Sequence, residues 1–322
     1  AARSPIIIGG NQPAYISAPV ALADKFTWET ATTLDFGIDV DLLSSRFSTS
    51  FDWYNRKTTD MITAGPLLPV VFGASVPRGN YADLETKGFE LSLKWNGKIK
   101  TPSPISYGVR LTLGDNVSYI TKYNNPQGVV TADVNLFTTN YYVGQRVGDI
   151  WGLTTEGLFT SAEDIAKHAD QSGVIVSSGN KVMPGDIKFK DLNGDGKINQ
   201  GKNTLDDHGD WSVIGNSSPR YTYGITTDFS WKGVSLSMFF QGVGKRDWYP
   251  SLGANYFWGQ YSHWYSIIPK STMKNNWTEE NPDPNAYWPR LRAPMVYGPR
   301  ELQAQTRYLQ NASYIRLKDL TI

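Results

Sequence analysis

A chain of 322 residues is long enough for one large β domain or two domains of ordinary size. Hydrophobic residues make up 40% of the sequence and charged residues 19%, a composition that excludes an intrinsically disordered chain. Lys and Arg number 31 against 30 Asp and Glu, and the sequence contains no basic run that could neutralise a phosphate backbone. Nucleic acid is therefore not an expected partner.

The absence of cysteine removes disulfides, thiolate metal sites and cysteine nucleophiles, but it does not select a cellular compartment. No stretch reaches the roughly 18 consecutive apolar residues of a membrane helix. The chain starts at Ala1 without an initiator Met or a signal peptide, and it stops at Ile322 inside an alternating segment. We therefore expect a piece of a longer polypeptide.

Alternation with a period of two residues is the dominant pattern, and it predicts strands with two different faces. Between positions 34 and 42, Phe36, Ile38 and Val40 share one face, while Asp35 and Asp39 share the other. Similar segments predict strands over residues 31–42, 46–61, 84–96, 105–120, 220–231 and 234–244.

Two architectures fit such strands. A soluble antiparallel sandwich also alternates apolar and polar residues, but its strands are usually about five or six residues long. Here the strands reach the roughly 10 residues that cross a bilayer at a tilt, and aromatic residues such as Trp53, Trp95 and Trp231 lie at strand ends. The pattern favours an all-β transmembrane antiparallel barrel, with the sandwich as the alternative.

The connections between these strands alternate strictly in length. The short ones are 43–45, 97–104 and 232–233, and the long ones are roughly 63–82, 121–219 and 246–312. Barrels of the outer membrane combine short periplasmic turns with long extracellular loops, so we expect 121–219 and 246–312 to be extracellular. Within them we expect a short helix from Ser161 to Ala169, capped by Ser161, and a proline-rich ordered loop over 281–300.

The segment from Asp191 to Asn199 matches the first nine positions of a calcium loop of the EF-hand type. Expected ligands are Asp191, Asn193, Asp195, the Lys197 carbonyl and Asn199, with Gly196 at the turn and Ile198 as an apolar anchor. The twelfth position is Lys202, which cannot bind a cation, so a carboxylate must come from elsewhere: Asp206, or its neighbour Asp207. The alternative is a turn rich in Asp, Asn and Gly that holds no ion.

Catalysis finds little support in the sequence. His168, His208 and His263 lack the spacing of zinc ligands, and neither a nucleophile elbow nor a Walker A motif is present. We therefore expect no catalytic residues and no enzyme activity.

Aromatic residues are dense between positions 248 and 288. Flat rings provide a large contact area at a small entropic cost, so exposed aromatics of this density usually indicate recognition. We take Trp248, Trp258, Tyr261 and Trp264 as candidate contacts for a substrate or a partner protein. The alternative is that the rings pack the loop against itself.

Several segments together resemble the barrel of SusC-like TonB-dependent transporters of the outer membrane. The resemblance begins with Phe26-Thr27-Trp28-Glu29-Thr30 and continues in the same order nearly to the C-terminus. Its further segments are residues 51–62, 87–91, 184–196, 213–216, 219–224, 239–244, 288–291 and 311–318.

The resemblance implies a multi-pass barrel of 22 strands in the cell outer membrane, with an N-terminal plug, a TonB box and a SusD-like surface lipoprotein as a lid. The chain over 1–322 would be a C-terminal-side part of that barrel, without the plug and the terminal strands. Familiar members often carry Asp at the twelfth position of the calcium-like loop, where this chain has Lys202.

The function expected from this resemblance is nutrient uptake: TonB-driven import of oligosaccharides, with TonB acting through the missing N-terminal part. Asp35, Asp39, Asp52, Glu90 and Arg110 would line the lumen. Membrane lipid would contact the opposite face, formed by Phe36, Ile38, Val40, Phe51, Leu91, Leu93, Val109, Leu111, Ile225 and Phe229. Import of peptides by the same machinery, or a surface glycan-binding β-protein without transport, are the alternatives.

Overall fold

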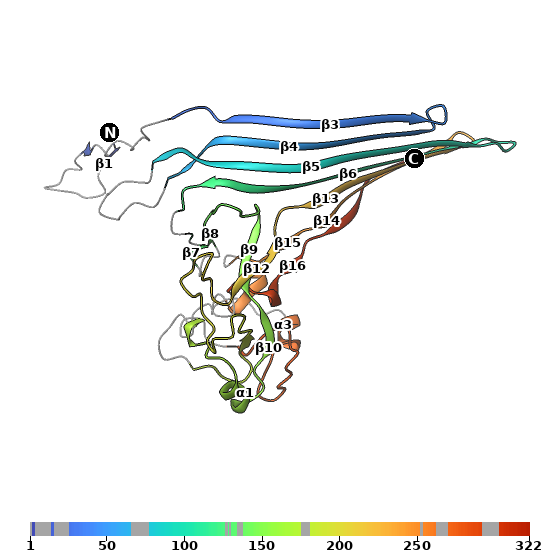
Figure 1. Ribbon diagram of the computed structural model, residues 1–322. Helices are drawn as coiled ribbons and strands as arrows, with labels where there is room; N and C mark the ends of the chain where they lie inside the picture. Colours follow the sequence, from blue (N-terminus) through green and yellow to red (C-terminus); the bar gives the residue numbers. More distant parts are fainter. Residues whose placement is uncertain are drawn as a thin grey trace.

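A computed structural model gives the architecture of the chain (Figure 1). The residues that it describes are 2–3, 14–15, 26–65, 77–125, 128, 130–133, 138–174, 181–251, 254–261, 270–291 and 303–322.

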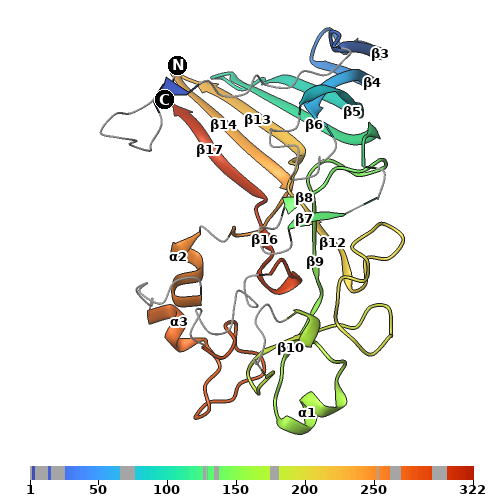
Figure 2. The same cartoon turned by 90° about the vertical axis from the view of Figure 1, so that its left-hand side faces the viewer.

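One antiparallel sheet of seven long strands dominates the structure, and it stays open in this chain (Figures 1 and 2). The spatial order is β17-β14-β13-β6-β5-β4-β3. The strands are β3 (Thr30–Leu42), β4 (Phe47–Ala64), β5 (Arg78–Ile99), β6 (Ile105–Tyr123), β13 (Arg220–Trp231), β14 (Val234–Lys245) and β17 (Tyr314–Thr321). All six strands expected from the alternation are present, and the all-β antiparallel architecture is confirmed.

The strand register places apolar side chains in rows across one face of the sheet. Ile38 is opposite Phe51, and Phe51 is opposite Leu91. Rings stack along this face: the centroids of Phe36 and Trp53 are 6.1 Å apart. The face is nevertheless open, since Phe36 is 62% exposed. A soluble protein would cover such a continuous apolar surface, so this face requires an apolar environment.

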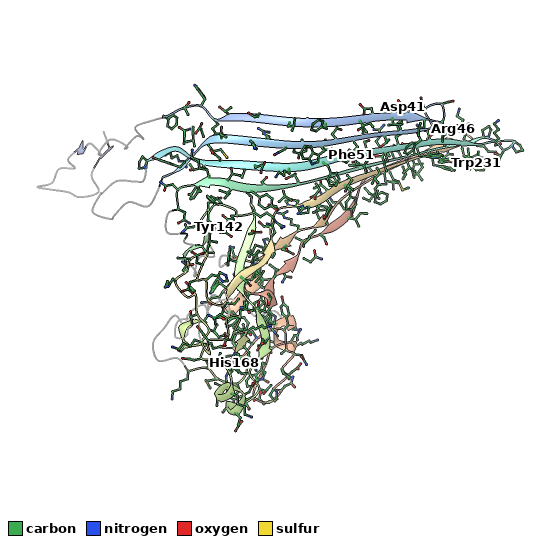
Figure 3. All side chains as sticks on the ribbon, viewed as in Figure 1. Asp41, Arg46, Phe51, Tyr142, His168 and Trp231 are labelled. Atoms are coloured by element: carbon green, nitrogen blue, oxygen red, sulfur yellow. The ribbon has the colours of Figure 1, made fainter. Side chains whose placement is uncertain are left out.

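Polar side chains form the matching rows on the other face. Asp39 lies opposite Ser50, and the same row continues through Ser92 and Thr112. Side chains at successive positions therefore alternate between the two faces, and Figure 3 draws side chains on both sides of the sheet.

The two ends of the sheet differ as the connection lengths predict. Short turns join β3 to β4, β5 to β6 and β13 to β14 at one end; Leu43, Ser44 and Ser45 all have positive φ in the first of these turns. The long connections leave from the opposite end (Figure 1). Two of them are residues 124–219, called here the first excursion, and residues 246–313, the second excursion. The third, expected over 63–82, is shorter because β4 extends to Ala64 and β5 begins at Arg78, and its residues 66–76 lie outside the described residues.

The excursions contain short elements. The first holds β7 (Thr131–Asp133), β8 (Thr138–Thr139), β9 (Asp149–Leu153), β10 (Thr155–Leu158), α1 (Ala162–Lys167), a 3-10 turn η2 (Ser172–Val174), β11 (Ile187–Phe189) and β12 (Trp211–Asn216). The second holds β15 (Asp247–Trp248), α2 (Asn255–Trp258), η3 (Gly259–Tyr261), α3 (Lys270–Lys274), η5 (Thr306–Tyr308) and β16 (Gln310–Asn311).

The expected short helix is confirmed as α1. Its N-cap Ser161 accepts a hydrogen bond from the backbone N–H of Asp164, as expected. Residues 281–291 contain no strand, and 292–300 lie outside the described residues. None of the described helices is long and apolar enough to span a bilayer.

The hydrophobic core lies in the excursions and not in the sheet. Leu153 and Phe189 of the first excursion are fully buried, together with Tyr308 of the second. The backbone also joins the two excursions, because the N–H of Leu153 donates to the carbonyl of Ala304 at 2.8 Å. The excursions therefore fold as one unit beside the end of the sheet.

An ion pair closes the first excursion where it meets the sheet. Arg220, the first residue of β13, donates two hydrogen bonds to Asp115 of β6, each 2.5 Å long. Asp115 also accepts from the backbone N–H of Tyr221. This bidentate contact fixes the ends of an excursion of about a hundred residues to neighbouring strands.

The two faces can be distinguished by a pair of lysine substitutions in the full-length protein. Leu93→Lys lies in the middle of the apolar face, and we expect it to lower the free energy of unfolding in bilayers by about 2–4 kcal/mol. Ser92→Lys, on the polar face, should cost far less. Equal losses for both variants, measured by denaturant unfolding in lipid, would contradict this assignment of the faces.

Candidate functional site

Trp258, one of the candidate contact residues, lies in the centre of the second excursion. Its side chain is 1% exposed, and its Nε1 donates to the carbonyl of Ser251 at 2.9 Å. The ring makes edge-on contacts with Phe257 at 4.9 Å and Tyr308 at 5.2 Å between centroids. Its position is that of a core residue.

The other aromatic candidates occupy different environments. Tyr261 is 4% exposed, stacks on Trp288 and donates its hydroxyl to the carbonyl of Pro289 at 2.8 Å. Trp248 lies on β15 at 38% exposure, and Trp264 lies outside the described residues. The structure thus brings Trp258 and Tyr261 into one cluster with Trp288 and leaves Trp248 at the surface.

Burial also governs the chemistry of this aromatic core. Tyr249 donates its hydroxyl to the carbonyl of Gln303 at 2.6 Å. Desolvation raises the pKa of Tyr249 well above the ordinary value of a phenol, so the ring stays neutral. The second excursion is therefore held by uncharged aromatic groups whose polar atoms bond to backbone carbonyls.

The calcium-like loop folds back on itself through its own oxygen atoms. Asp191 accepts from the backbone N–H groups of Gly194 at 2.7 Å and of Gly196 at 2.9 Å. Asp195 accepts from the backbone N–H of Lys197 at 2.8 Å. Asn193 and Asn199 accept in the same manner from residues two positions later. Every one of these side chains offers oxygen, which suits a hard cation such as calcium.

The anchor of this loop is Ile198, which is fully buried as expected. Asp210 is an anchor that the sequence analysis missed. Its carboxylate is 0% exposed and accepts from the N–H groups of Leu192 at 2.7 Å and Asn199 at 2.8 Å, so it ties both ends of the loop together. The sequence did contain a signal for this anchor, because Asp210 is a third carboxylate shortly after Asp206 and Asp207.

The acidic residues offered as substitutes for the twelfth ligand lie on the surface of the loop. Asp206 is exposed, and Asp207 makes an ion pair of 3.7 Å with Lys202, the residue at the twelfth position. Within the described part of the chain, no group of three or more carboxylate or imidazole side chains converges on one point. Binding of an ion here would therefore depend on amide and backbone oxygens beside the carboxylates.

The polar face of the sheet carries charges in unusual pairs. Asp52 is directly opposite Glu90, and Lys94 is directly opposite Arg110. Like charges in facing positions repel each other, and no ion pair of the described residues neutralises these four. Lys94 was not among the expected lumen residues, although it alternates in step with Glu90 and Ser92.

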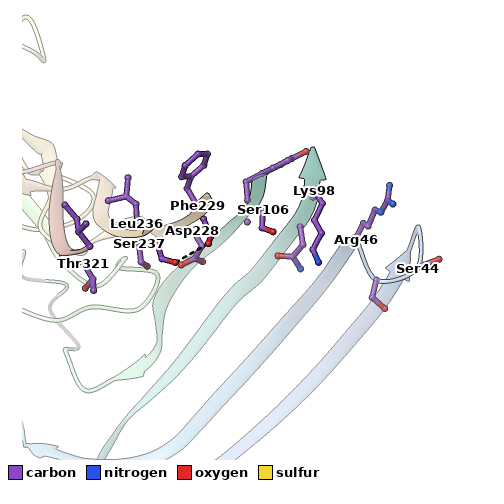
Figure 4. A pocket seen from close by; sticks show the side chains of 17 residues that line it. Ser44, Arg46, Lys98, Ser106, Asp228, Phe229, Leu236, Ser237 and Thr321 are labelled. Atoms are coloured by element: carbon purple, nitrogen blue, oxygen red, sulfur yellow. Dashed lines mark hydrogen bonds between the residues drawn. The ribbon is translucent and has the colours of Figure 1, made fainter. Parts of the chain in front are cut away.

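A hollow of about 690 Å³ lies on this face, near the short turns (Figure 4). Asp228 and Ser237 point to one side of the sheet there, and Phe229 and Leu236 point to the other. The close-up thus shows both environments on two adjacent strands.

Comparison with known proteins agrees with this architecture. Residues 3–278 match the family described as TonB dependent receptor-like, beta-barrel. The chain therefore belongs to the TonB-dependent receptor β-barrel family.

Relatives place the chain more closely within this family. TonB-dependent receptor P3 of Formosa agariphila is 27% identical over 324 residues, which cover 98% of this chain and 29% of the relative. TonB-dependent receptor SusC of Bacteroides thetaiotaomicron is 30% identical over 163 residues, which cover 44% of this chain and 16% of the relative. The chain is thus a SusC-like barrel segment that spans less than a third of the length of these relatives.

The fold is also found in solved structures. A chain of the RagAB peptide transporter superimposes with a TM-score of 0.67 at 21% identity, over 98% of this chain and 31% of that one. The RagAB peptide importer in its "open-open" state matches with a TM-score of 0.63. At this identity the likeness concerns the barrel fold.

Alanine substitutions distinguish a core ring from a surface ring. We expect Trp258→Ala to destabilise the excursions by about 3–5 kcal/mol, because it removes a fully buried indole. Trp248→Ala, at a half-exposed position, should cost less. Hydrogen exchange of backbone amides in both excursions measures the difference. Unchanged protection in Trp258→Ala together with lost binding of cargo or lid would instead identify Trp258 as a recognition residue.

Proposed function

We propose that this chain is part of a transporter that imports oligosaccharides across the outer membrane with energy from TonB. The observation that best supports this proposal is the structure of the seven-stranded sheet. Its strands are 12 to 22 residues long in the central five positions, with an apolar face that needs lipid and a polar face that suits an aqueous lumen. The excursions extend from one end only, as extracellular loops of such barrels do.

The mechanism follows from this arrangement. The charged rows of Asp52, Glu90, Lys94 and Arg110 would line the lumen, and the excursions would stand on the outer surface. TonB would act through the N-terminal part of the protein, and a SusD-like lipoprotein would close over the excursions. Trp248, half-exposed on β15, is the described aromatic candidate best placed to touch cargo or this lid.

Peptide import is the second candidate, and a specific observation favours it: the solved structures with the same fold include peptide transporters. The polar lumen face suits either cargo. Oligosaccharide import is the function that the resemblance to SusC-like transporters implies, and TonB-dependent receptor SusC is among the relatives of this chain. A glycan-binding β-protein without transport fits less well, because it would leave the apolar face of the sheet uncovered.

Deletion of the gene for the full-length protein tests the transport function. We expect loss of growth on one class of oligosaccharide, and the same loss in a strain without TonB, because import through such barrels requires that energy source. Growth on the monosaccharide is the control. Loss of growth on peptides alone would assign peptide cargo, and normal growth on every polymer would contradict the proposal.

We propose further that Asp191, Asn193, Asp195, Asn199 and the Lys197 carbonyl hold one calcium ion. The folded loop already presents these oxygens around the turns at Gly194 and Gly196, whose φ angles are +75° and +79°. Asp206 would complete the ligand set by a local rearrangement of its exposed segment. The ion would order the first excursion and not act as a switch.

Calcium titration of the full-length protein tests this site. We expect one ion with oxygen ligands at about 2.3–2.6 Å, and a large loss of affinity in Asp195→Ala, because a carboxylate ligand disappears. Asp206→Ala should weaken binding if its carboxylate joins the shell, and Glu280→Ala, on an exposed loop of the second excursion, is the control. A structure in millimolar calcium that shows only water at the loop would disprove the assignment.

A further inference from the structure

The two excursions line an open polar cleft of about 600 Å³, and neither the aromatic core nor the calcium-like loop belongs to it. β10 and β11 of the first excursion form one wall, together with Asp164 of α1. Asn285 and Arg307 of the second excursion form the other. β10 and α1, which contribute lining residues, lie in the part of the excursions that is remote from the sheet (Figure 1).

A break in the strand pairing shapes the floor of this cleft. The register of β10 against β11 shifts between Thr155 and Gly157, which is a β-bulge. Gly157 has φ +147°, and nothing lies within 4 Å of the place where a Cβ would be. Bulges re-aim neighbouring side chains, and a glycine with open space above it lets a ligand approach the backbone.

The bulge leaves Glu156 exposed at the cleft. Its carboxylate has no hydrogen bond or ion pair to any described residue. The side-chain amide of Asn285 likewise has no hydrogen bond to any described residue, although the backbone N–H of Asn285 donates to Asp283. The cleft thus offers two polar side chains, one from each excursion, that make no hydrogen bond within the described part of the chain.

The remaining charged groups are held in place by neighbours. Lys188 donates to Asp164 at 2.8 Å, and this hydrogen bond holds the pKa of Asp164 below its ordinary value. Arg307 donates to the backbone carbonyls of Ala286 and Tyr287. These hydrogen bonds use only part of the donors of each cation, and both residues line the cleft.

The composition of the lining selects the class of ligand. Glu156 and Asp164 balance Lys188 and Arg307, so the cleft carries no net charge and attracts neither an anion nor a cation. Among the described lining residues, Leu158 and Pro284 have the apolar side chains, too few to hold a hydrophobic peptide side chain. Sugar hydroxyls donate and accept at once, and they match a lining with both kinds of group. The volume suits a small ligand.

From these observations we propose that the cleft between Glu156 and Asn285 binds a neutral oligosaccharide, as an outer contact site for the cargo. This proposal rests on the proposed import of oligosaccharides and names a place where the cargo is recognised. Glu156, Asn285 and the free donors of Lys188 and Arg307 would bond to the hydroxyls, and the open backbone at Gly157 would admit a sugar ring.

The test uses the full-length transporter in detergent with its lid lipoprotein. Calorimetric titration employs hexamers of α-1,4-glucose, β-1,4-glucose, xylose and mannose, with a hexapeptide of Gly and Ala as the peptide probe. The variant is Glu156→Ala combined with Asn285→Ala, because neither side chain supports the fold. Glu280→Ala, which removes an exposed acid of the second excursion outside the cleft, is the matched control.

We expect one of the sugars to bind, and the double variant to bind it at least about tenfold more weakly, since hydrogen bonds to a charged group and to an amide are lost. The control should bind as the unchanged protein does, and hydrogen exchange in the excursions should be the same in all three. An unchanged affinity in the double variant would contradict sugar binding at the cleft, but it would not contradict oligosaccharide import.

Other outcomes separate the two proposals. Binding of the hexapeptide that the double variant weakens assigns the cleft to peptides and overturns the sugar class. Weaker association with the lid lipoprotein, at unchanged sugar affinity, makes the cleft a protein contact instead. If no sugar binds and the growth experiment also shows no loss on oligosaccharides, the proposed function fails together with the cleft.

Discussion

The alternation of side chains along a continuous antiparallel ladder is the constraint on which the rest of the structure depends. Each strand satisfies the backbone groups of its neighbours, and the register decides which residues share a face. A slip of one residue at β4 would place Phe51 among the carboxylates and Asp52 among the apolar rings. Because few side chains of the sheet are buried within this chain, its two faces require two different environments, and its ends are free to carry long insertions.

The strands were predictable because their signal is local. Each segment reports its own two faces, so the positions of β3, β13 and β14 follow from sequence to within one residue. The ends of β4 and β5 did not follow. β5 begins at Arg78, six residues before the apolar alternation starts, because polar contacts continue the ladder there: the backbone N–H of Asp60 donates to Asp83 at 2.8 Å, and the backbone N–H of Thr27 donates to the side chain of Asn80 at 2.8 Å. Such contacts join residues distant in sequence and leave no periodic pattern.

The candidate sites were predictable only where the chemistry is contained in one segment. The calcium-like loop could be named from nine consecutive residues, but the buried carboxylate of Asp210 acts through the fold, by binding two N–H groups at opposite ends of the loop. The aromatic segment shows the same limit. Composition cannot distinguish a buried Trp258 from a half-exposed Trp248, because their environments depend on Tyr308 and Gln310, which lie fifty or more residues later in the sequence. The polar cleft needs both excursions and a bulge, and therefore has no sequence signature.

These features are mechanically connected. Asp210 holds the loop and is followed directly by β12, which pairs with β9, and the chain then returns to the sheet at Arg220 and its bidentate contact with Asp115. On the other side of the loop, the N–H of Ile198 donates to the carbonyl of Asp170, and the chain before Asp170 leads back through α1 to the cleft. A chain of hydrogen-bonded elements thus runs from the sheet to the cleft through one loop. The proposed calcium ion would lie within this connection, so it would order the loop that links the sheet to Asp164 and Lys188.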